Sequence, residues 1–178
     1  ISNLRTVMTM DKTYIDELLK YGEHIALECK KAEGGVPKSI WETYSAFANT
    51  NGGTIILGVE EDFQADNWDD RFSVLGVHNP ENIVKDFWNT INGGKVNVNI
   101  LKDEDVYILQ EGDICLLVIH VPRAEFNMRP IYVGENPYKG TYKRNHEGDY
   151  HATEHEIMGM IRDQNPDGND SMILEYYT

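Results

Sequence analysis

The stretch from Ser45 to Glu61 constrains more than any other what this chain can fold into. Apolar residues recur at helical spacing over residues 40–48. Residues 49–53 are rich in Asn and Gly, which tolerate positive φ, so we expect the helix to stop there and the chain to reverse. Residues 54–59 form a short run rich in β-branched side chains, typical of a strand covered on both faces. The sequence therefore predicts a helix, a turn and a buried strand that ends in the acids Glu60, Glu61 and Asp62.

Similar periodicities predict the remaining elements. Capping and spacing signals predict three more helices: one after Asp11, one opened by Asn79-Pro80, and one preceded by the capping-box pair Thr153 and Glu156. Further strands are expected over residues 25–30, 72–77, 96–101, 105–110, 114–121, 131–133 and 141–144. The strand over 72–77 is expected to pair with the central one, and 96–121 to form an antiparallel meander.

These elements indicate an α+β fold with about four helices and a mixed, mainly antiparallel sheet. The length of 178 residues suits one compact domain, which we place at residues 11–164. Residues 1–10 are interpreted as a loose N-terminal leader. Residues 165–178 are interpreted as a linker and the start of a missing downstream module.

Composition narrows the functional classes. The formal net charge of −14 opposes non-specific binding to nucleic acid, because phosphate contacts supply most of that affinity. No apolar run approaches a membrane span and no secretory signal is visible, so we expect a cytoplasmic protein without a membrane partner. Cys29 and Cys115 lie in apolar runs and are predicted to be buried free thiols.

Four segments of the chain resemble a known family. Their order and spacing are similar to those of the Schlafen/AlbA-type domain, also called the divergent AlbA or divergent AAA-4 DNA-binding domain. The resemblance covers roughly residues 23–161, and residues 47–59 are its most specific part. The segments are Leu27 to Lys30, Ser45 to Gly53, Leu57 to Asp62 and Tyr142 to Asn145.

The resemblance implies an α+β fold and a place in a larger bacterial protein, of the kind labelled a transcriptional regulator or an ATP-dependent helicase-like protein. In such proteins an ATPase-type module or a winged helix often follows, so ATP would enter only through a module that is absent here. In the animal branch of the family, related domains cleave RNA with three acids. The matching positions here are Glu23, Glu28 and Glu61. Glu61 stands where the family usually has Asp, which puts catalysis in question.

Three carboxylates could hold Mg²⁺ or Mn²⁺, and the metal could activate water for attack on a phosphodiester. Glu23 and Glu28 are five residues apart, so a continuous strand would place them on opposite faces. Both reach one site only if Glu23 lies on the turn after Gly22. The alternative is structural: Glu28 and Lys30 form a surface ion pair, and Glu61 is a loop acid.

A short basic segment is the candidate for nucleic-acid contact. Residues 139–144 carry three basic residues and no acid, with tyrosines interleaved, so they could grip phosphates and stack a base. The alternative is an ordinary amphipathic strand. The candidate residues are Lys139, Tyr142, Lys143 and Arg144, and Lys30 could extend that surface.

Three functions remain open from the sequence. The first is a DNA- or RNA-binding regulatory module without catalysis of its own. The second is a metal-dependent nuclease that uses Glu23, Glu28 and Glu61. The third is a protein-interaction or homodimerisation domain, which the acidic balance favours. The glycine pairs match neither a P-loop nor a dinucleotide fingerprint, so no nucleotide site is expected within the chain.

Overall fold

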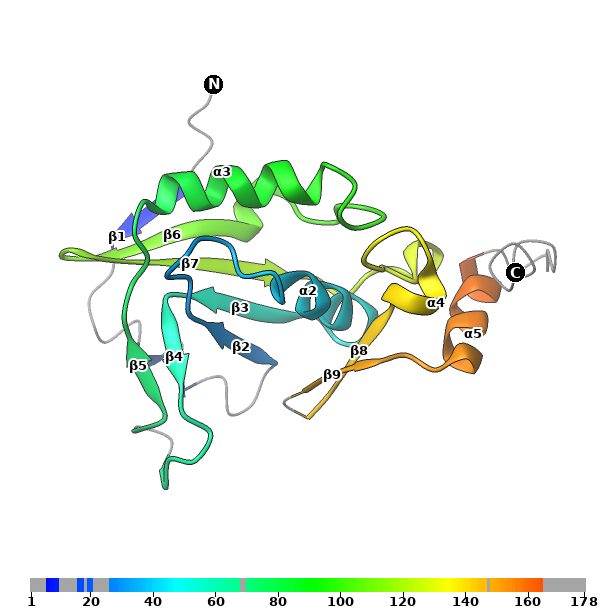
Figure 1. The fold of residues 1–178 in the computed structure, drawn as a ribbon, viewed down its shortest axis with the longest axis horizontal. Coiled ribbons are helices and arrows are strands. Elements are labelled where there is room, and N and C mark those ends of the chain that lie inside the picture. The colour runs from blue at the N-terminus through cyan, green and yellow to red at the C-terminus, as the bar shows by residue number, and fades with distance from the viewer. Residues whose placement is uncertain are drawn as a thin grey trace. The chain divides into compact units, whose positions relative to one another are not determined.

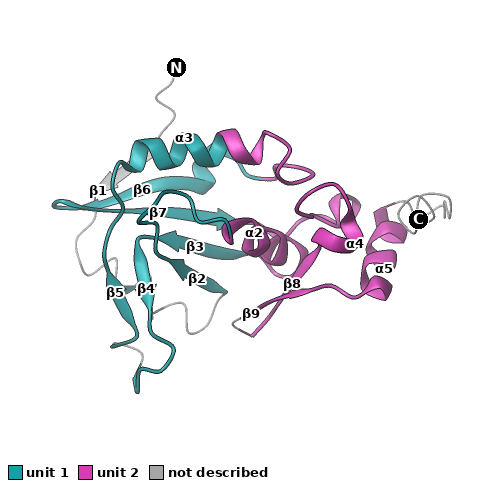
Figure 2. Ribbon diagram, viewed as in Figure 1, with its two compact units in different colours: residues 1–38, 53–88, 101–121 teal, residues 39–52, 89–100, 122–178 magenta. Residues whose placement is uncertain are grey.

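The computed structural model describes residues 6–9, 16–17, 19–20, 26–67, 70–146 and 148–164. Its residues group into two compact units that are interleaved along the sequence (Figure 2). Unit 1 comprises residues 1–38, 53–88 and 101–121; unit 2 comprises residues 39–52, 89–100 and 122–178. No helix in the described ranges has the length and apolar character needed to cross a membrane.

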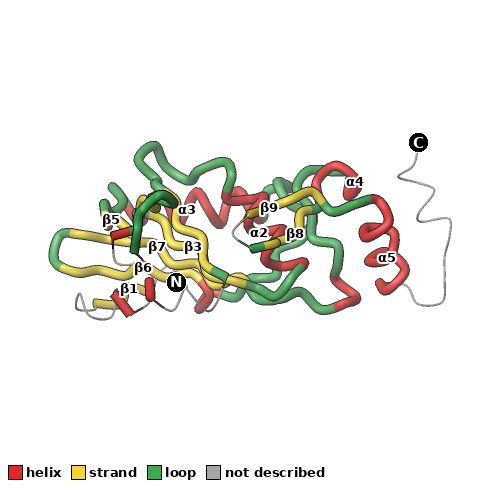
Figure 3. The backbone as a smooth tube through the Cα atoms, turned by 90° about the horizontal axis from the view of Figure 1, so that it is seen from below, coloured by secondary structure: helices red, strands yellow, loops and turns green. Residues whose placement is uncertain are grey.

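A five-stranded sheet forms the centre of unit 1 (Figures 1 and 3). The strand order is β1-β6-β7-β3-β2. β7 pairs antiparallel with β6 and β3, whereas β1 joins β6, and β2 joins β3, in parallel. The bounds are Thr6–Thr9 for β1, Leu27–Lys30 for β2, Gly53–Leu57 for β3, Val106–Glu111 for β6 and Ile114–Val121 for β7.

The central strand β3 is buried on both faces, as its run of β-branched residues predicts. Ile56 packs into a core cluster with Leu109, Leu116 and Val118. Ile55 and Leu57 point to the opposite face and are fully buried as well. The two cysteines are free; Cys29 is buried as predicted, whereas Cys115 is only half-buried.

The predicted strand over residues 54–59 is split at Gly58. Gly58 has a φ of 104°, which ends β3 and starts β4 (Val59–Glu61). β4 pairs antiparallel with β5 (Phe72–Val74) as a separate two-stranded ribbon. The strand predicted over 72–77 therefore pairs with the continuation beyond Gly58, not with β3 itself.

The predicted meander over residues 96–121 is half right. β6 and β7 form the expected hairpin, but residues 96–101 form no strand, only one isolated bridge from Val96 to Val133. The reason is a side chain in unit 2: the Tyr44 hydroxyl donates to Val98 O at 2.8 Å and accepts from Ile100 N at 3.0 Å. These bonds satisfy backbone groups that a strand neighbour would otherwise pair.

Three helices follow the predicted patterns. α2 (Ile40–Asn49) is buried except at Glu42. α3 (Pro80–Ile91) starts at the proline, as expected from its fixed φ. α5 (Glu154–Gln164) follows the predicted capping box, in which Thr153 N donates to Glu156 Oε1 and Glu156 N to Thr153 Oγ1.

Unit 2 also contains elements that the sequence did not reveal. α4 (Pro137–Gly140) lies in a segment interpreted as loop, and β9 (Gly148–His151) pairs antiparallel with the predicted strand β8 (Tyr142–Asn145). Near the N-terminus, part of the predicted leader forms β1. The linker at 165–170 lies outside the described residues.

The architecture is α+β with mixed, mostly antiparallel sheets, which confirms the predicted class.

Candidate nucleic-acid interface

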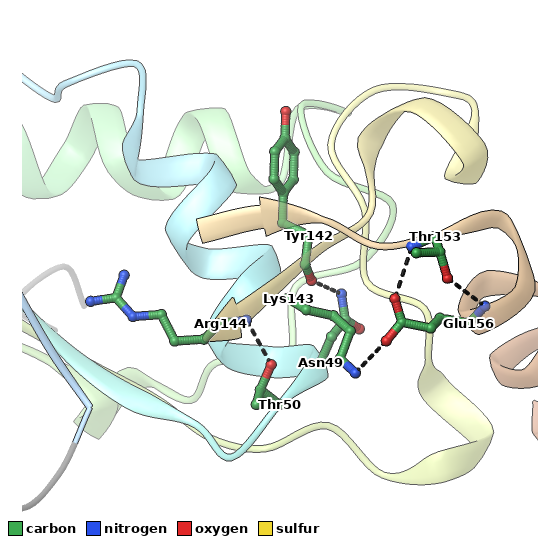
Figure 4. Close-up of polar contacts among 7 residues, drawn as sticks. All are labelled: Asn49, Thr50, Tyr142, Lys143, Arg144, Thr153 and Glu156. Atoms are coloured by element: carbon green, nitrogen blue, oxygen red, sulfur yellow. Dashed lines mark hydrogen bonds and ion pairs between the residues drawn. The ribbon is translucent and has the colours of Figure 1, made fainter. Parts of the chain in front are cut away.

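The end of α2 holds the backbone of β8 in unit 2 through Asn49 (Figure 4). The buried Asn49 amide nitrogen donates to Tyr142 O at 3.0 Å and to Ile131 O at 2.8 Å. Its amide oxygen accepts from Ile131 N at 2.9 Å. One side chain thus pairs backbone groups of two chain segments that are more than 80 positions away in sequence.

Ser45 and Thr50 add two bonds to the same strand. Tyr142 N donates to Ser45 Oγ at 3.0 Å, and Arg144 N donates to Thr50 Oγ1 at 2.9 Å. The polar residues of the stretch 45–50 therefore fix both the position and the register of β8. This is the physical reason for hydroxyl and amide side chains on a helix that is otherwise apolar.

Lys143 leaves β8 toward α5 (Figure 4). Its ammonium group lies 2.7 Å from Glu156 Oε2, and its side chain is 37% exposed. The hydrogen bond from Lys143, followed by the backbone bond from Thr153, lowers the pKa of Glu156. The pair is open to solvent, so the lysine can exchange this carboxylate for another anion at small cost.

Arg144 is held differently from Lys143. Its guanidinium lies 2.7 Å from Asp149 Oδ1 and over the Phe47 ring, 4.9 Å from the centroid. Asp149 also accepts a 2.6 Å bond from the Thr43 hydroxyl. With 7% of its side chain exposed, Arg144 serves the packing of β8 and β9 on α2. Phosphate binding by Arg144 stays a prediction.

Tyr142 and Lys139, the other two predicted contact residues, also belong to unit 2. The Tyr142 ring lies 4.4 Å from the His151 ring, and its hydroxyl donates to Glu42 at 3.3 Å. Burial first, and Glu42 second, raises the pKa of Tyr142. Lys139, on α4, is exposed. The sequence analysis did not single out Tyr150 on β9, whose 57% exposure leaves a ring available for contact. The signal was an aromatic residue between the polar residues Asp149 and His151.

The acidic candidates and Lys30 belong to unit 1, and Glu23 lies outside the described residues. Glu61 pairs with Arg71 at 2.5 Å, and Glu28 lies 3.6 Å from Lys30. The two residues are therefore paired, as the structural alternative predicted, but both side chains are less than a fifth exposed, so the pair is not at the surface. Glu61 ends strand β4 and is not the predicted loop acid.

Glu28 and Glu61 act on the same buried thiol. Burial most of all, then Glu61 and Glu28, raises the pKa of Cys29. Both carboxylates therefore lie within electrostatic range of this thiol. Within the described residues, however, no group of three or more His, Cys, Asp or Glu is placed to hold a metal ion. Two carboxylates already paired with cations fit a divalent metal only if a third ligand joins them and the cations give way.

Comparison with known proteins agrees with this architecture. The family model described as Schlafen, AlbA_2 matches residues 23–153. Among solved structures, the chain is similar to the N-terminal domain of a candidate ATP-dependent DNA helicase, a RecG-related protein from Nitrosomonas europaea. That likeness has 28% sequence identity and a TM-score of 0.56, and it covers 81% of this chain and 94% of the other.

A second similar structure is the DIP2311 protein from Corynebacterium diphtheriae. Its likeness has 16% identity and a TM-score of 0.53, covers 85% of this chain and 28% of the other, and shows the fold alone. No curated protein that was compared matches the chain. Because the family match spans residues 23–153 of 178, the chain belongs to the Schlafen AlbA_2 family.

Proposed function

We propose that this chain is a nucleic-acid-binding regulatory module of a larger bacterial protein, and that the β8–β9 hairpin with α4 makes the contact. The hydrogen bonds from Ser45, Asn49 and Thr50 to β8 carry the proposal. Through these bonds the end of α2 supports one strand, and that strand presents Lys143 next to Tyr142 and opposite Tyr150. A preorganised strand loses little conformational entropy on binding.

The distribution of charge supports the same surface. Both strongly acidic runs of the chain, Glu60 to Asp70 and Lys102 to Asp113, belong to unit 1. On unit 2, Lys139 is exposed, Lys143 is partly exposed and the Tyr150 ring is open. Lysines can contact phosphates, and an open tyrosine can stack on a base.

The test is binding of labelled single-stranded DNA, duplex DNA and structured RNA, followed by fluorescence anisotropy in low salt. We expect Lys139→Ala and Lys143→Ala each to weaken binding several-fold, because each removes a phosphate contact. Lys85→Ala, which removes an exposed lysine of α3 in unit 1, is the matched control and should bind as the wild type does. Absence of binding to all three nucleic acids would reject the proposal.

A metal-dependent nuclease is the second candidate, favoured by the convergence of Glu28 and Glu61 on Cys29. It predicts Mn²⁺-dependent cleavage of structured RNA that is lost in Glu28→Gln, which keeps the size of the side chain but removes its charge. Lys30→Ala is the companion variant, because it frees the Glu28 carboxylate from its partner. Cleavage that persists in Glu28→Gln would come from another source.

A further inference from the structure

An exposed phenylalanine in unit 2 lies close to two arginines. Phe126, in the 3₁₀ turn η3 (Phe126–Met128), is 58% exposed. The guanidinium carbon of Arg129 lies 4.4 Å from the ring centroid, and that of Arg123 lies 5.6 Å from it. Met128, also 37% exposed, extends the apolar area. We call Arg123, Phe126 and Arg129 the η3 cluster.

Hydrogen bonds to the backbone anchor the η3 cluster within unit 2. Arg129 is buried, with 8% exposure, and its Nε donates to Ala124 O at 3.0 Å. Ala124 N in turn donates to Ala48 O, at the end of α2, at 2.8 Å. Arg129 N closes the turn on Phe126 O at 3.4 Å. The buried arginine is thus fixed, while Arg123 and the ring remain at the surface.

The described part of the chain offers the arginines of the η3 cluster no ion-pair partner. Among the described residues, no carboxylate lies within 4.0 Å of a guanidinium nitrogen of Arg123 or Arg129. Burial and the nearby Arg123 both lower the pKa of Arg129, and Asp163 on α5 opposes them. Two positive charges are thus held close together, and among the described residues only Asp163 is seen to oppose their repulsion. Such an arrangement favours the binding of an anion.

A second exposed phenylalanine shows what such a site looks like when its charge is already used. Phe63 in unit 1 is 59% exposed, and Arg71 lies 4.7 Å over its ring. Arg71, however, forms an ion pair with Glu61 at 2.5 Å. The η3 cluster has similar distances between guanidinium and ring, and neither of its arginines has an ion pair with a described carboxylate.

We propose that the η3 cluster binds one nucleotide of a single-stranded nucleic acid, with the phosphate between Arg123 and Arg129 and the base stacked on the cluster. Guanidinium planes and aromatic rings both stack unpaired bases, whereas a duplex hides the faces of its bases. The inference rests on the proposed function and adds a specificity to it: a preference for single strands.

The hairpin and η3 both lie against α5. Glu156, the partner of Lys143, is in the first turn of α5, and Asp163, which acts on Arg129, is in the last. Seven residues of α-helix span about 10 Å. About three nucleotides at the spacing of B-form DNA cover that length of helix, so both groups are tested together on one short single strand.

The experiment measures the affinity of the whole chain for a labelled oligothymidylate of about 12 nucleotides, a length within the range of single-strand site sizes. An abasic strand of equal length and a duplex are measured in parallel.

Phe126→Ala should weaken oligothymidylate binding by about 5- to 150-fold, the effect of one lost stacking contact. Phe126→Trp should restore it. Phe63→Ala is the matched control and should leave affinity unchanged, and thermal unfolding checks that all variants fold.

The outcomes separate the two proposals. If Lys143→Ala weakens binding and Phe126→Ala does not, the proposed function stands and the η3 inference falls. If the abasic strand binds the wild type as tightly as oligothymidylate does, or if polyglutamate of equal charge competes as well, stacking is not involved and the inference is overturned. If the wild type binds none of these strands, both proposals fall.

Discussion

At the scale of the residue, Asn49 explains how the end of α2 holds two distant segments of the chain. Its amide has donor and acceptor groups in a fixed arrangement, and the two segments that it joins need both. A hydroxyl could serve one of these groups, and an apolar side chain none. The sequence showed Asn49 only as a residue that stops a helix, because its partners, Ile131 and Tyr142, are distant in the chain.

We predict that Asn49→Ala lowers the free energy of unfolding by about 2–4 kcal/mol, because the substitution leaves Ile131 N and Tyr142 O buried without their partner. Asn89→Ala, at an exposed position of α3, removes the same amide from the surface and should cost less than about 0.5 kcal/mol. Urea unfolding of the two variants measures the difference. Equal costs would mean that Asn49 does not hold β8.

His120 gives a pH dependence at the same scale. It bridges Thr54 Oγ1 through Nδ1 at 2.9 Å and the Tyr107 hydroxyl through Nε2 at 3.0 Å. Burial lowers its pKa, and Asp105 opposes this in part. The folded state therefore binds this proton less readily than the unfolded state, whose histidine has a pKa of about 6.5. The neutral ring contributes stability above that value, and the contribution is lost as pH falls from about 6.5 through the folded pKa.

We expect the free energy of unfolding of the wild type to fall more steeply than that of His120→Gln between pH 7.5 and pH 5, because glutamine does not titrate. Urea unfolding at several pH values measures both slopes. An NMR titration of the His120 ring is the independent check, and its midpoint should lie below that of a free histidine. Parallel slopes for the two proteins would contradict the assignment.

At the scale of the element, two strands predicted from periodicity differ in the structure, and in both cases the backbone gives the reason. Residues 53–59 look like one strand, since every side chain favours β structure, yet Gly58 divides them. Residues 96–101 alternate like a strand, yet Tyr44 takes the backbone groups that a neighbouring strand would need. α2, α3 and α5 were predictable because their signals are local: apolar spacing, a first-turn proline and a capping box.

Gly58→Ala tests the break between β3 and β4. An added Cβ would lie 2.8 Å from Leu116 Cδ2 and 3.0 Å from the Gly76 carbonyl carbon, at a φ that L-residues avoid. We expect a loss of about 2–4 kcal/mol in the free energy of unfolding. Gly34→Ala is the matched control, because nothing lies within 4 Å of its Cβ position, and it should be neutral or slightly stabilising. Similar behaviour of the two variants would show that Gly58 tolerates a side chain.

At the scale of the whole molecule, the sequence predicts the class of fold and the family, and not the grouping of its residues. Helix and strand types follow from periodicity, so an α+β class was accessible. The two units interleave three segments each, and such grouping depends on contacts between distant residues. The same limit applies to the sites. Lys143 was predictable as basic, but the pairing of Arg144 with Asp149, and the stacking of Arg123 and Arg129 on Phe126, exist only in the folded chain.

The charge of the whole molecule leads to a last prediction, on salt. The proposed contacts to single strands use Lys139, Lys143, Arg123 and Arg129, so the logarithm of affinity should fall with the logarithm of salt concentration with a slope near −3. Removing Lys143 should reduce this slope by about 0.7, and Lys85→Ala should not change it.

The net charge of −14 adds a long-range repulsion that grows as screening weakens. The plot should therefore flatten below roughly 0.05 M salt, where the Debye length exceeds about 14 Å. Anisotropy titrations over a salt series measure both features. A slope steeper than about −6 would require more phosphate contacts than these four groups supply, and would place the interface elsewhere on the molecule.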